Sequence, residues 1–318
     1  MVFETVIAVA VLIIGIVLMT YSSDKAVEHS VKIASALRIS PLVIGLILVS
    51  IGTDLPEIVN SIVSCAVGHA DIELGDSLGS VLTQITLVLG LLPFLAGKFK
   101  VKRKEVLVIG AFEVLALILA VSIAEKGYFT RINALFLVAS WPVFILLTRS
   151  ITAKNAKEKE HAMAHPNEKP LYHLRDWMIA ILGFVGVAIG AYAVVQSVIK
   201  LSADFHISEY LISFFVVAIG TSLPELMVDL TAIRKKQYEL AIGDAIGSCL
   251  VDASVSVGIG QFFFPQAVSG ETAMITGLYA IFGSIVVILT LALREKVDKK
   301  AGALFIFLYL FSYTLLRV

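Results

Sequence analysis

Charged residues are scarce in this sequence: they make up 16% of 318 residues, where a soluble domain carries roughly 25%. Acidic and basic residues balance at 25 each, so the formal net charge is zero and no nucleic-acid partner is expected. Only two cysteines are present, Cys65 and Cys249, and neither has the CxxC or His spacing of a zinc site. We interpret both as small packing residues. The N-terminus lacks a basic region and a small-residue cleavage site, so no signal peptide is predicted.

Apolar residues are abundant instead, at 58% of the sequence with a mean hydropathy of +0.93. They form runs of about 20 residues, the length that crosses a bilayer core. The sequence therefore predicts an all-α membrane protein with ten transmembrane helices, whose surroundings are the lipid bilayer. The ten runs lie near 3–21, 41–66, 74–97, 105–124, 130–148, 177–199, 209–232, 240–263, 271–293 and 301–316.

Two motifs occur twice, each time 168 residues apart and without a gap. Internal repeats of this kind identify a duplicated architecture. The first motif contains a glutamate in strongly apolar sequence, where an ionisable group is costly and functional by default. The copies are Gly52–Glu57 with Gly220–Glu225, and Gly75–Ser80 with Gly243–Ser248.

The duplication divides the chain into a first five-helix repeat (1–148), a linker loop (149–175) and a second repeat (176–318). Because five is odd, the second repeat enters the membrane from the opposite side, which predicts inverted topology. With the N-terminus outside, 21 of the 25 Lys and Arg residues fall on the cytoplasmic side. This is a strong positive-inside signal. We expect both termini outside a plasma membrane and the linker in the cytoplasm.

The first motif places a hydroxyl and a carboxylate on one helical face, because Thr53 and Glu57 are four residues apart, as are Thr221 and Glu225. A proline stands between them in each copy. Proline removes a backbone donor and crowds the carbonyl four residues earlier. Backbone carbonyls are therefore expected to be free beside each glutamate. Irregular backbone at membrane depth is tolerated only inside protein or along an aqueous cavity.

The second motif adds side chains that also lie four apart, Ser80 with Gln84 and Ser248 with Asp252. Its glycines have the small-xxx-small spacing that lets helices approach closely. If the two hairpins cross near the midplane, Glu57, Glu225 and Asp252 meet hydroxyls, an amide and carbonyls. Such a set contains oxygen donors only, which hard cations such as calcium prefer. For Ser80 and Ser248 alone, a packing role is the alternative.

These motifs resemble the two alpha-repeats of the calcium/cation antiporter superfamily, and most closely those of prokaryotic sodium/calcium exchangers. The resemblance covers nearly the whole chain. It implies that Glu57 and Glu225 are the central calcium ligands. It further implies roles in the calcium and sodium subsites for Thr53 and Thr221 through their carbonyls, for Ser80, Ser222, Ser248, Gln84 and Asp252, and for the carbonyls of Ser50 and Ala218.

Several positions depart from the family pattern. Asp54 stands where serine is usual, as Ser222 does in the second copy, and Gln84 replaces asparagine. An added carboxylate three residues from Glu57 indicates either a bound proton or a more highly charged cargo. Asp76 and Asp244 replace asparagine; helix capping or indirect hydrogen bonding is favoured for both over direct ligation. Farther along, Asp229 is expected to pair with Arg or Lys.

We therefore expect a secondary active antiporter, not an enzyme, that exchanges Na+ for Ca2+ by alternating access, without a resident cofactor. The alternative within the same fold is H+-coupled Ca2+ exchange or Mg2+ transport, for which Asp54 is the main support. A channel is disfavoured because two motif copies in one chain suit an occluded site better than a pore. A non-transporting scaffold leaves the buried acids unexplained. One chain holds both repeats, so a monomer is the expected functional unit.

Overall fold

The computed structural model of the chain describes residues 2–36, 50–152, 174–234, 236 and 238–314. Within these residues the protein is helical apart from one small two-stranded ribbon. Eight helices are long and apolar enough to cross a membrane. The predicted all-α membrane fold in two repeated halves is confirmed.

The described part of the first repeat contains, in chain order, seven α-helices, a π-helical turn and a short strand. They are α1 (Val2–Ala36), α3 (Ser50–Thr53), α4 (Leu55–Ala66), α5 (Ala70–Leu82), η2 (Thr83–Val88), α6 (Leu89–Leu95), β1 (Phe99–Lys100), α7 (Arg103–Ala124) and α8 (Arg131–Thr152).

The described elements of the second repeat are α10 (Leu174–Phe205), α11 (Glu209–Ile212), η4 (Ser213–Val217), α12 (Ala218–Thr221), α13 (Leu223–Arg234), α14 (Tyr238–Val251), η5 (Asp252–Ser256), α15 (Val257–Phe263), α16 (Gly270–Arg294), β2 (Lys296–Val297) and α17 (Lys299–Ser312). In the second repeat the strand follows α16, the equivalent of α7, whereas β1 precedes α7.

Most predicted spans coincide with these helices, and the differences lie at their ends. The stretch after Lys25 continues α1 without a break as far as Ala36. The predicted second span begins within 37–49, which lies outside the described residues. Most of the predicted linker, 153–173, also lies outside them. The last helix, α17, has 14 residues and is about 21 Å long at 1.5 Å per residue, which is shorter than a bilayer core.

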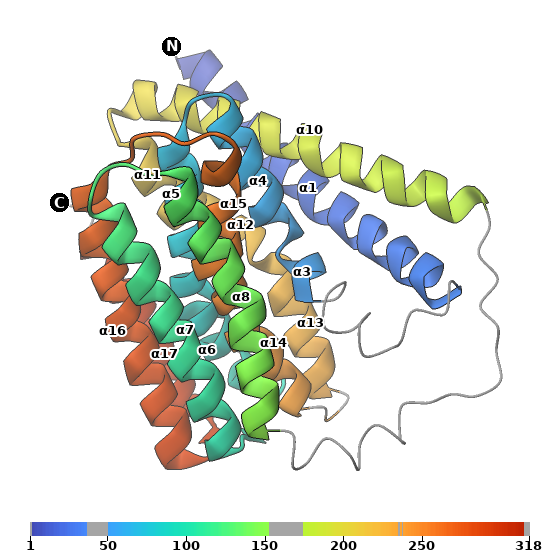
Figure 1. Cartoon of the computed structure of the whole chain (residues 1–318), viewed down its shortest axis with the longest axis vertical. Helices are drawn as coiled ribbons and strands as arrows, with labels where there is room; N and C mark the ends of the chain where they lie inside the picture. The colour runs from blue at the N-terminus through green and yellow to red at the C-terminus, as the bar shows by residue number, and fades with distance from the viewer. Residues whose placement is uncertain (1, 37–49, 153–173, 235, 237, 315–318) are drawn as a thin grey trace.

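Loops that were predicted on one side of the membrane lie together in the structure (Figure 1). At one face, the α7–α8 loop meets the α15–α16 loop, where the Phe129 N–H donates to the Gln266 carbonyl at 3.0 Å. At the opposite face, β1 pairs with β2 in antiparallel register, Phe99 opposite Val297. The turn after α4 lies at the first of these faces and the turn after α13 at the second (Figure 1). The two repeats are therefore inverted.

The ribbon also carries the cap of the last helix. The Asp298 carboxylate accepts a hydrogen bond from the Ala301 backbone N–H at 3.0 Å, which begins α17. That backbone hydrogen bond lowers the pKa of Asp298 below its ordinary value, with Arg294 and Lys296 adding to the effect.

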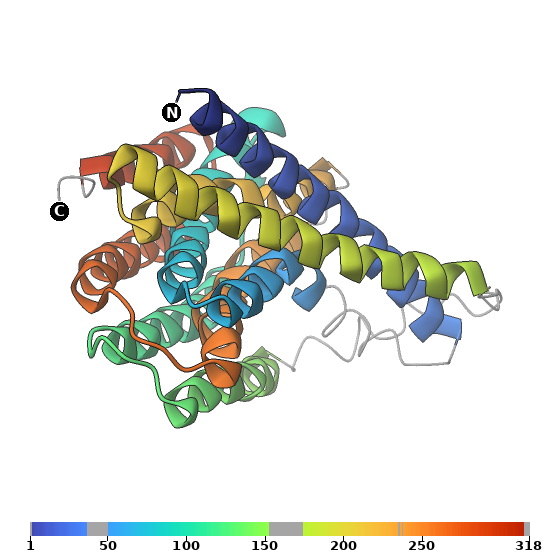
Figure 2. The ribbon, with the colours of Figure 1, turned by 90° about the horizontal axis from the view of Figure 1, so that it is seen from above.

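Helices α1 and α10 lie side by side across the outside of the core (Figures 1 and 2). Small residues permit this contact. A Cβ added to Gly190 would stand 2.8 Å from the Gly15 carbonyl, and one added to Gly183 would stand 2.8 Å from Ala26. These helices are equivalent elements of the two repeats, so the pair straddles the symmetry between them.

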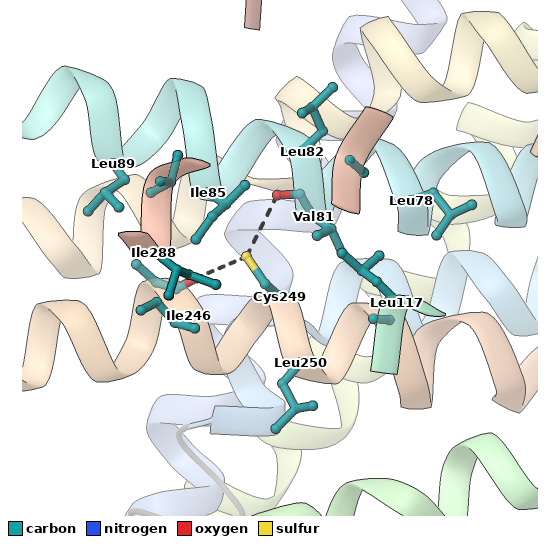
Figure 3. Close-up of a cluster of buried hydrophobic side chains, with 14 of the residues drawn as sticks. Leu78, Val81, Leu82, Ile85, Leu89, Leu117, Ile246, Cys249, Leu250 and Ile288 are labelled. Carbon is teal, nitrogen blue, oxygen red and sulfur yellow. Dashed lines mark hydrogen bonds between the residues drawn. The ribbon is translucent and has the colours of Figure 1, made fainter. Parts of the chain in front are cut away.

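The core is built around α5 and α14, which carry the second motif. Gly75 and Gly79 confirm the predicted close approach, because a Cβ at either would stand 2.3 or 2.4 Å from the carbonyls of Tyr210 and Phe214. For Gly243 and Gly247, nothing in the described part of the chain lies within 4 Å of such a Cβ. The apolar contacts between α5 and α14 surround Cys249 (Figure 3). Cys65 and Cys249 are both buried free thiols, as the packing interpretation requires.

Candidate cation site

Both copies of the first motif break their helix at the same position. The chain leaves helical geometry at Asp54, with φ −82° and ψ 9°, and again at Ser222, with φ −81° and ψ 6°. These angles fall in the sparsely populated bridge region, which is common at active sites. The prolines then occupy the second position of α4 and α13, where a missing N–H is tolerated. The duplicated motif thus produces a duplicated break.

The carbonyls at the breaks are only partly available. The Gly52 carbonyl, which Pro56 leaves without its helical donor, accepts a hydrogen bond from the Ser23 hydroxyl of α1 at 3.1 Å. In the second copy, the Ala218 carbonyl accepts from the Ser222 N–H at 3.2 Å. Each carbonyl oxygen has a second lone pair, so a cation can still bind there. Ser50 begins α3.

Two glutamates form the centre of the candidate site. Glu57 and Glu225, each in the first turn after a break, are fully buried. Both oxygens of Glu225 and Oε2 of Glu57 have no hydrogen-bond partner in the described structure. The two carboxylates are close enough to interact electrostatically. Two buried like charges without donors are strongly unfavourable, so the arrangement requires a cation or protons.

Hydroxyls connect the two repeats beside Glu57, and an amide joins α4 to α5 within the first repeat. The Ser80 hydroxyl lies 3.5 Å from Glu57 Oε1 and 3.3 Å from the Thr221 hydroxyl. Asp76 accepts from Thr221 at 3.1 Å and from the amide of Asn60 at 2.6 Å. Residues of the first motif in one repeat therefore contact residues of the second motif in the other, as the crossing of hairpins predicted.

The helix-capping interpretation of Asp76 and Asp244 is wrong. Helices α5 and α14 begin at Ala70 and Tyr238, so both aspartates lie seven residues in, at mid-helix. Hydrogen bonding within the site, the other part of that expectation, holds for Asp76. Sequence reasoning missed its donor Asn60, although this residue lies one turn beyond Glu57 on the same helix.

Equivalent residues of the two repeats meet each other. Gln84 Nε2 donates to Asp252 Oδ2 at 3.0 Å, and these positions are 168 residues apart. The Cys249 thiol reaches the Val81 carbonyl at 3.7 Å across the same spacing (Figure 3). A contact between equivalent positions occurs only at a symmetry axis. The pseudo-twofold axis therefore passes between α5–η2 and α14–η5, through the candidate site.

The site also contains π-helical turns that the sequence did not reveal. Gln84 and Asp252 lie at the start of η2 and η5, where α5 and α14 continue. The Ser256 hydroxyl, one turn on, donates to Asp252 Oδ1 at 3.0 Å. Such turns are rare and are frequent at functional sites. No residue pattern identifies them, because a π turn forms only when tertiary contacts stabilise it.

Further predicted residues surround this centre. Thr53 is buried at the end of α3. Asp54 is fully buried, and neither of its oxygens has a hydrogen-bond partner in the described structure; the hydroxyls of Ser222 and Ser248 also have none.

The expected pairing of Asp229 with Arg or Lys is wrong, because both of its oxygens are buried without a partner in the described structure. Its nearest strong electrostatic neighbour is another acid, Asp244.

Among the described residues, no basic side chain forms an ion pair with these acids. Every ion pair found among the described residues lies elsewhere. In the same part of the chain, no three His, Cys, Asp or Glu side chains come close enough to hold a metal ion by themselves. Cation binding here therefore needs hydroxyl and carbonyl oxygens in addition to the carboxylates. That donor set suits exchangeable hard cations.

Inverted repeats, broken helices and buried acids at the repeat interface define a secondary active ion transporter. Comparison with known proteins gives the family. The chain belongs to the sodium/calcium exchanger protein family, whose model matches residues 7–149 and 176–318. It is therefore a cation antiporter and not an enzyme.

Relatives of the chain match it along nearly its whole length. An uncharacterized membrane protein of Methanocaldococcus jannaschii is 30% identical over 98% of this chain and 99% of its own. The sodium/calcium exchanger MaX1 of Methanosarcina acetivorans is 23% identical over 94% and 95%. Among solved structures, the sodium-calcium exchanger NCX_Mj soaked with Na+ and Sr2+ has a TM-score of 0.62 at 27% identity, covering 98% of both chains.

Proposed function

We propose that this antiporter exchanges Na+ for Ca2+ at one site shared by the two repeats. Three unpartnered carboxylate oxygens on Glu57 and Glu225 carry the proposal, because only a cation or protons can compensate them in this buried position. The relatives named for sodium and calcium exchange support the choice of ions. Two Na+ or one Ca2+ neutralise the same pair of charges, so the ions compete for the site.

In this proposal, oxygen atoms of both motifs complete the coordination. Glu57 and Glu225 bind Ca2+ directly, with the carbonyls of Thr53 and Thr221 and the hydroxyls of Ser80 and Ser248. The sodium subsites use Ser222, Gln84 and Asp252, with carbonyls of Ser50 and Ala218. Asp76 acts indirectly by positioning Thr221, and Asp244 is proposed to act indirectly as its equivalent in the second repeat. Asp54 adds a further carboxylate to the set.

Exchange requires that the site open to one side at a time. Neutralised carboxylates can be occluded at low cost, whereas an empty acidic cluster cannot. The pair α1–α10 is the element proposed to move against the core, as one of its contacts, from Ser23 to the Gly52 carbonyl, lies at the break itself. In a plasma membrane with both termini outside, Na+ entry drives Ca2+ export by this mechanism.

A second candidate is H+-coupled Ca2+ exchange. One observation favours it: Asp54 places two unpartnered oxygens next to Glu57, which also interacts with it electrostatically. A proton on one of the two acids removes the repulsion. The equivalent position in the second repeat is Ser222, which has no charge.

Flux into proteoliposomes tests both candidates. Radiolabelled Ca2+ uptake is measured with an outward Na+ gradient, then with a pH gradient, and with Mg2+ as competitor. Uptake driven by the Na+ gradient is expected, with Mg2+ a weak competitor because it sheds water reluctantly. Uptake driven only by the pH gradient contradicts Na+ coupling and establishes the second candidate. Uptake that needs no counter-ion contradicts antiport.

A further inference from the structure

A further buried carboxylate outside the central site, Glu73, lies on α5 two turns before Ser80. It is fully buried, its Oε1 accepts a hydrogen bond from the Ser77 hydroxyl at 3.3 Å, and its Oε2 has no partner in the described structure. Gln261 of α15 lies against it and has an unpartnered Nε2. Neutral donors of this kind do not cancel a buried charge. Glu73 therefore needs either a cation or a proton to neutralise it.

Glu73 belongs to a polar seam between α4 and α5 that begins at the central site. On each helix, four buried polar residues stand at positions i, i+3, i+4 and i+7 and so share one face. Two contacts cross between the helices, Ser80 with Glu57 and Asn60 with Asp76 at 2.6 Å, and Ser77 bonds Glu73 within α5. The seam residues are Glu57, Asn60, Ser61 and Ser64 on α4, and Glu73, Asp76, Ser77 and Ser80 on α5.

The equivalent hairpin of the second repeat is apolar at four of these eight positions and has Glu225, Asp229, Asp244 and Ser248 at the other four. Glu73 corresponds to Ala241, Ser77 to Ala245 and Asn60 to Val228. The same hairpin fold is thus built with small apolar residues when the polar groups are absent, so packing does not demand them. The part of the seam formed by Glu73 and Ser77 is therefore found in the first repeat alone. It lies between Glu57, in the first turn of α4, and the turn that joins α4 to α5.

We propose that Glu73 is a binding station for the transported cation on the route between the central site and the face of the α4–α5 turn. The Glu73 carboxylate and the Ser77 hydroxyl hold a partly hydrated cation, and Asp76 draws it on toward Glu57. The inference rests on the proposed central site and extends it by one acid that has no copy in the second repeat. Acids that line a low-dielectric route raise the local cation concentration.

Side-resolved transport kinetics test this assignment. Half-saturating Ca2+ concentrations are measured separately at the two membrane faces, with right-side-out and inverted vesicles and the driving gradient that supports wild-type exchange. Glu73→Gln, which keeps the shape and removes the charge, is expected to raise half-saturation about tenfold at the face of the α4–α5 turn. Half-saturation at the opposite face stays unchanged, and Glu73→Asp restores most of the wild-type value.

Glu113→Gln is the matched control. Glu113 of α7 is a fully buried acid with the same local pattern, since one oxygen accepts from Ser284 of α16 at 2.7 Å and its Oε2 has no partner in the described structure, but it lies away from the seam. Its substitution should leave both half-saturation values as they are. If Glu73→Gln does not accumulate in membranes, Ser77→Ala takes its place, with a smaller shift expected at the same face.

Unchanged values at both faces, or an equal rise at both, overturn the assignment, because a station on one route acts at one face only. The identity of the two exchanged ions is tested separately. If the wild type responds to a pH gradient in place of Na+, the Na+/Ca2+ assignment fails. The ratio between Glu73→Gln and the wild type, measured with the same driver, still decides the role of Glu73.

Discussion

The two hairpins that carry the motifs share a centre and differ outside it. Both α4 and α13 begin after a break of the same geometry and place a buried glutamate in their first turn. Beyond that turn, the first hairpin is lined with hydrogen-bonded polar groups, whereas the second has valine and alanine at most of these positions. The two copies thus share the proposed cation centre, and the hairpins have diverged beyond it.

The hairpins also differ in their contacts with the helices packed against them. Ser61 of α4 donates to the Ser256 carbonyl at 2.6 Å and accepts from the Gly260 N–H at 3.1 Å. At the equivalent place of the second hairpin, Asp229 has no partner, and Leu92 stands where Gly260 does. The first hairpin is therefore tied closely to α15. The second carries an additional acid and a bulkier neighbour.

The largest effect is expected where the hairpins agree. Glu57→Gln and Glu225→Gln each remove one of the two central charges, and each should reduce Ca2+ flux in proteoliposomes at least about 100-fold, since a lost charged contact costs roughly 3 kcal/mol or more. Glu113→Gln, a buried acid outside the site, should keep its flux. Normal transport by either variant would show that the substituted glutamate is dispensable and would contradict a site shared by both.

The next effect sharpens the difference in packing. In Gly260→Ala, the new Cβ stands 2.2 Å from the Ser61 backbone carbonyl, so the α4–α15 contact must open. A loss of roughly 1–3 kcal/mol in stability is expected, read as a lower melting temperature in detergent. Gly283→Ala is the control, because its nearest neighbour is a flexible Leu82 side chain at 3.4 Å. Equal melting of the two variants would contradict the close α4–α15 contact.

Asp54→Ser makes the two breaks alike, since Ser222 stands at the second. Asp54 has no partner for either oxygen and interacts with Glu57, so its removal should change half-saturation by Ca2+ about tenfold and reduce the dependence of transport on pH. Asp54→Asn should have the same effect if charge is the cause. A pH profile and Ca2+ affinity that match the wild type would show that the asymmetry has no role in ion selection.

The smallest effect concerns the contact between α1 and the first break. Ser23→Ala removes the donor to the Gly52 carbonyl and copies the second repeat, where Ala191 is equivalent. About 1 kcal/mol of stability should be lost, measured by thermal unfolding. Ser197→Ala serves as comparison, because its hydroxyl only bonds the Ala193 carbonyl of its own helix at 2.8 Å. If Ser23→Ala leaves the stability unchanged, the Gly52 carbonyl has another hydrogen-bond donor.

Much of the architecture was predictable because it follows from hydropathy, charge and repetition. The 168-residue spacing gave the equivalence of Glu57 with Glu225, and the odd number of spans in each repeat gave the inversion. The proline-containing motifs predicted the helix breaks at Asp54 and Ser222. Each of these rests on a local or periodic signal that a single sequence contains.

Other features depend on tertiary contacts and were missed. The span containing the second motif was predicted from 74, but α5 begins at Ala70, so Glu73 was placed outside the membrane and Asp76 at a helix start. Hydropathy counts an acid against a span even where neighbouring helices shield it. Asp229 was assigned a basic partner from the nearby Arg234, which is exposed and lies beyond its reach. The π turns at η2 and η5 have no sequence signal.

The central claim is that acids from opposite repeats bind one shared cation. Equilibrium binding of radiolabelled Ca2+ to the purified protein tests it most directly. The wild type should bind one Ca2+ per chain at this site, displaced by Na+, and both Glu57→Gln and Glu225→Gln should lose that binding entirely. Two Ca2+ per chain in the wild type, with one retained in each variant, would show independent sites in the two repeats and contradict the account.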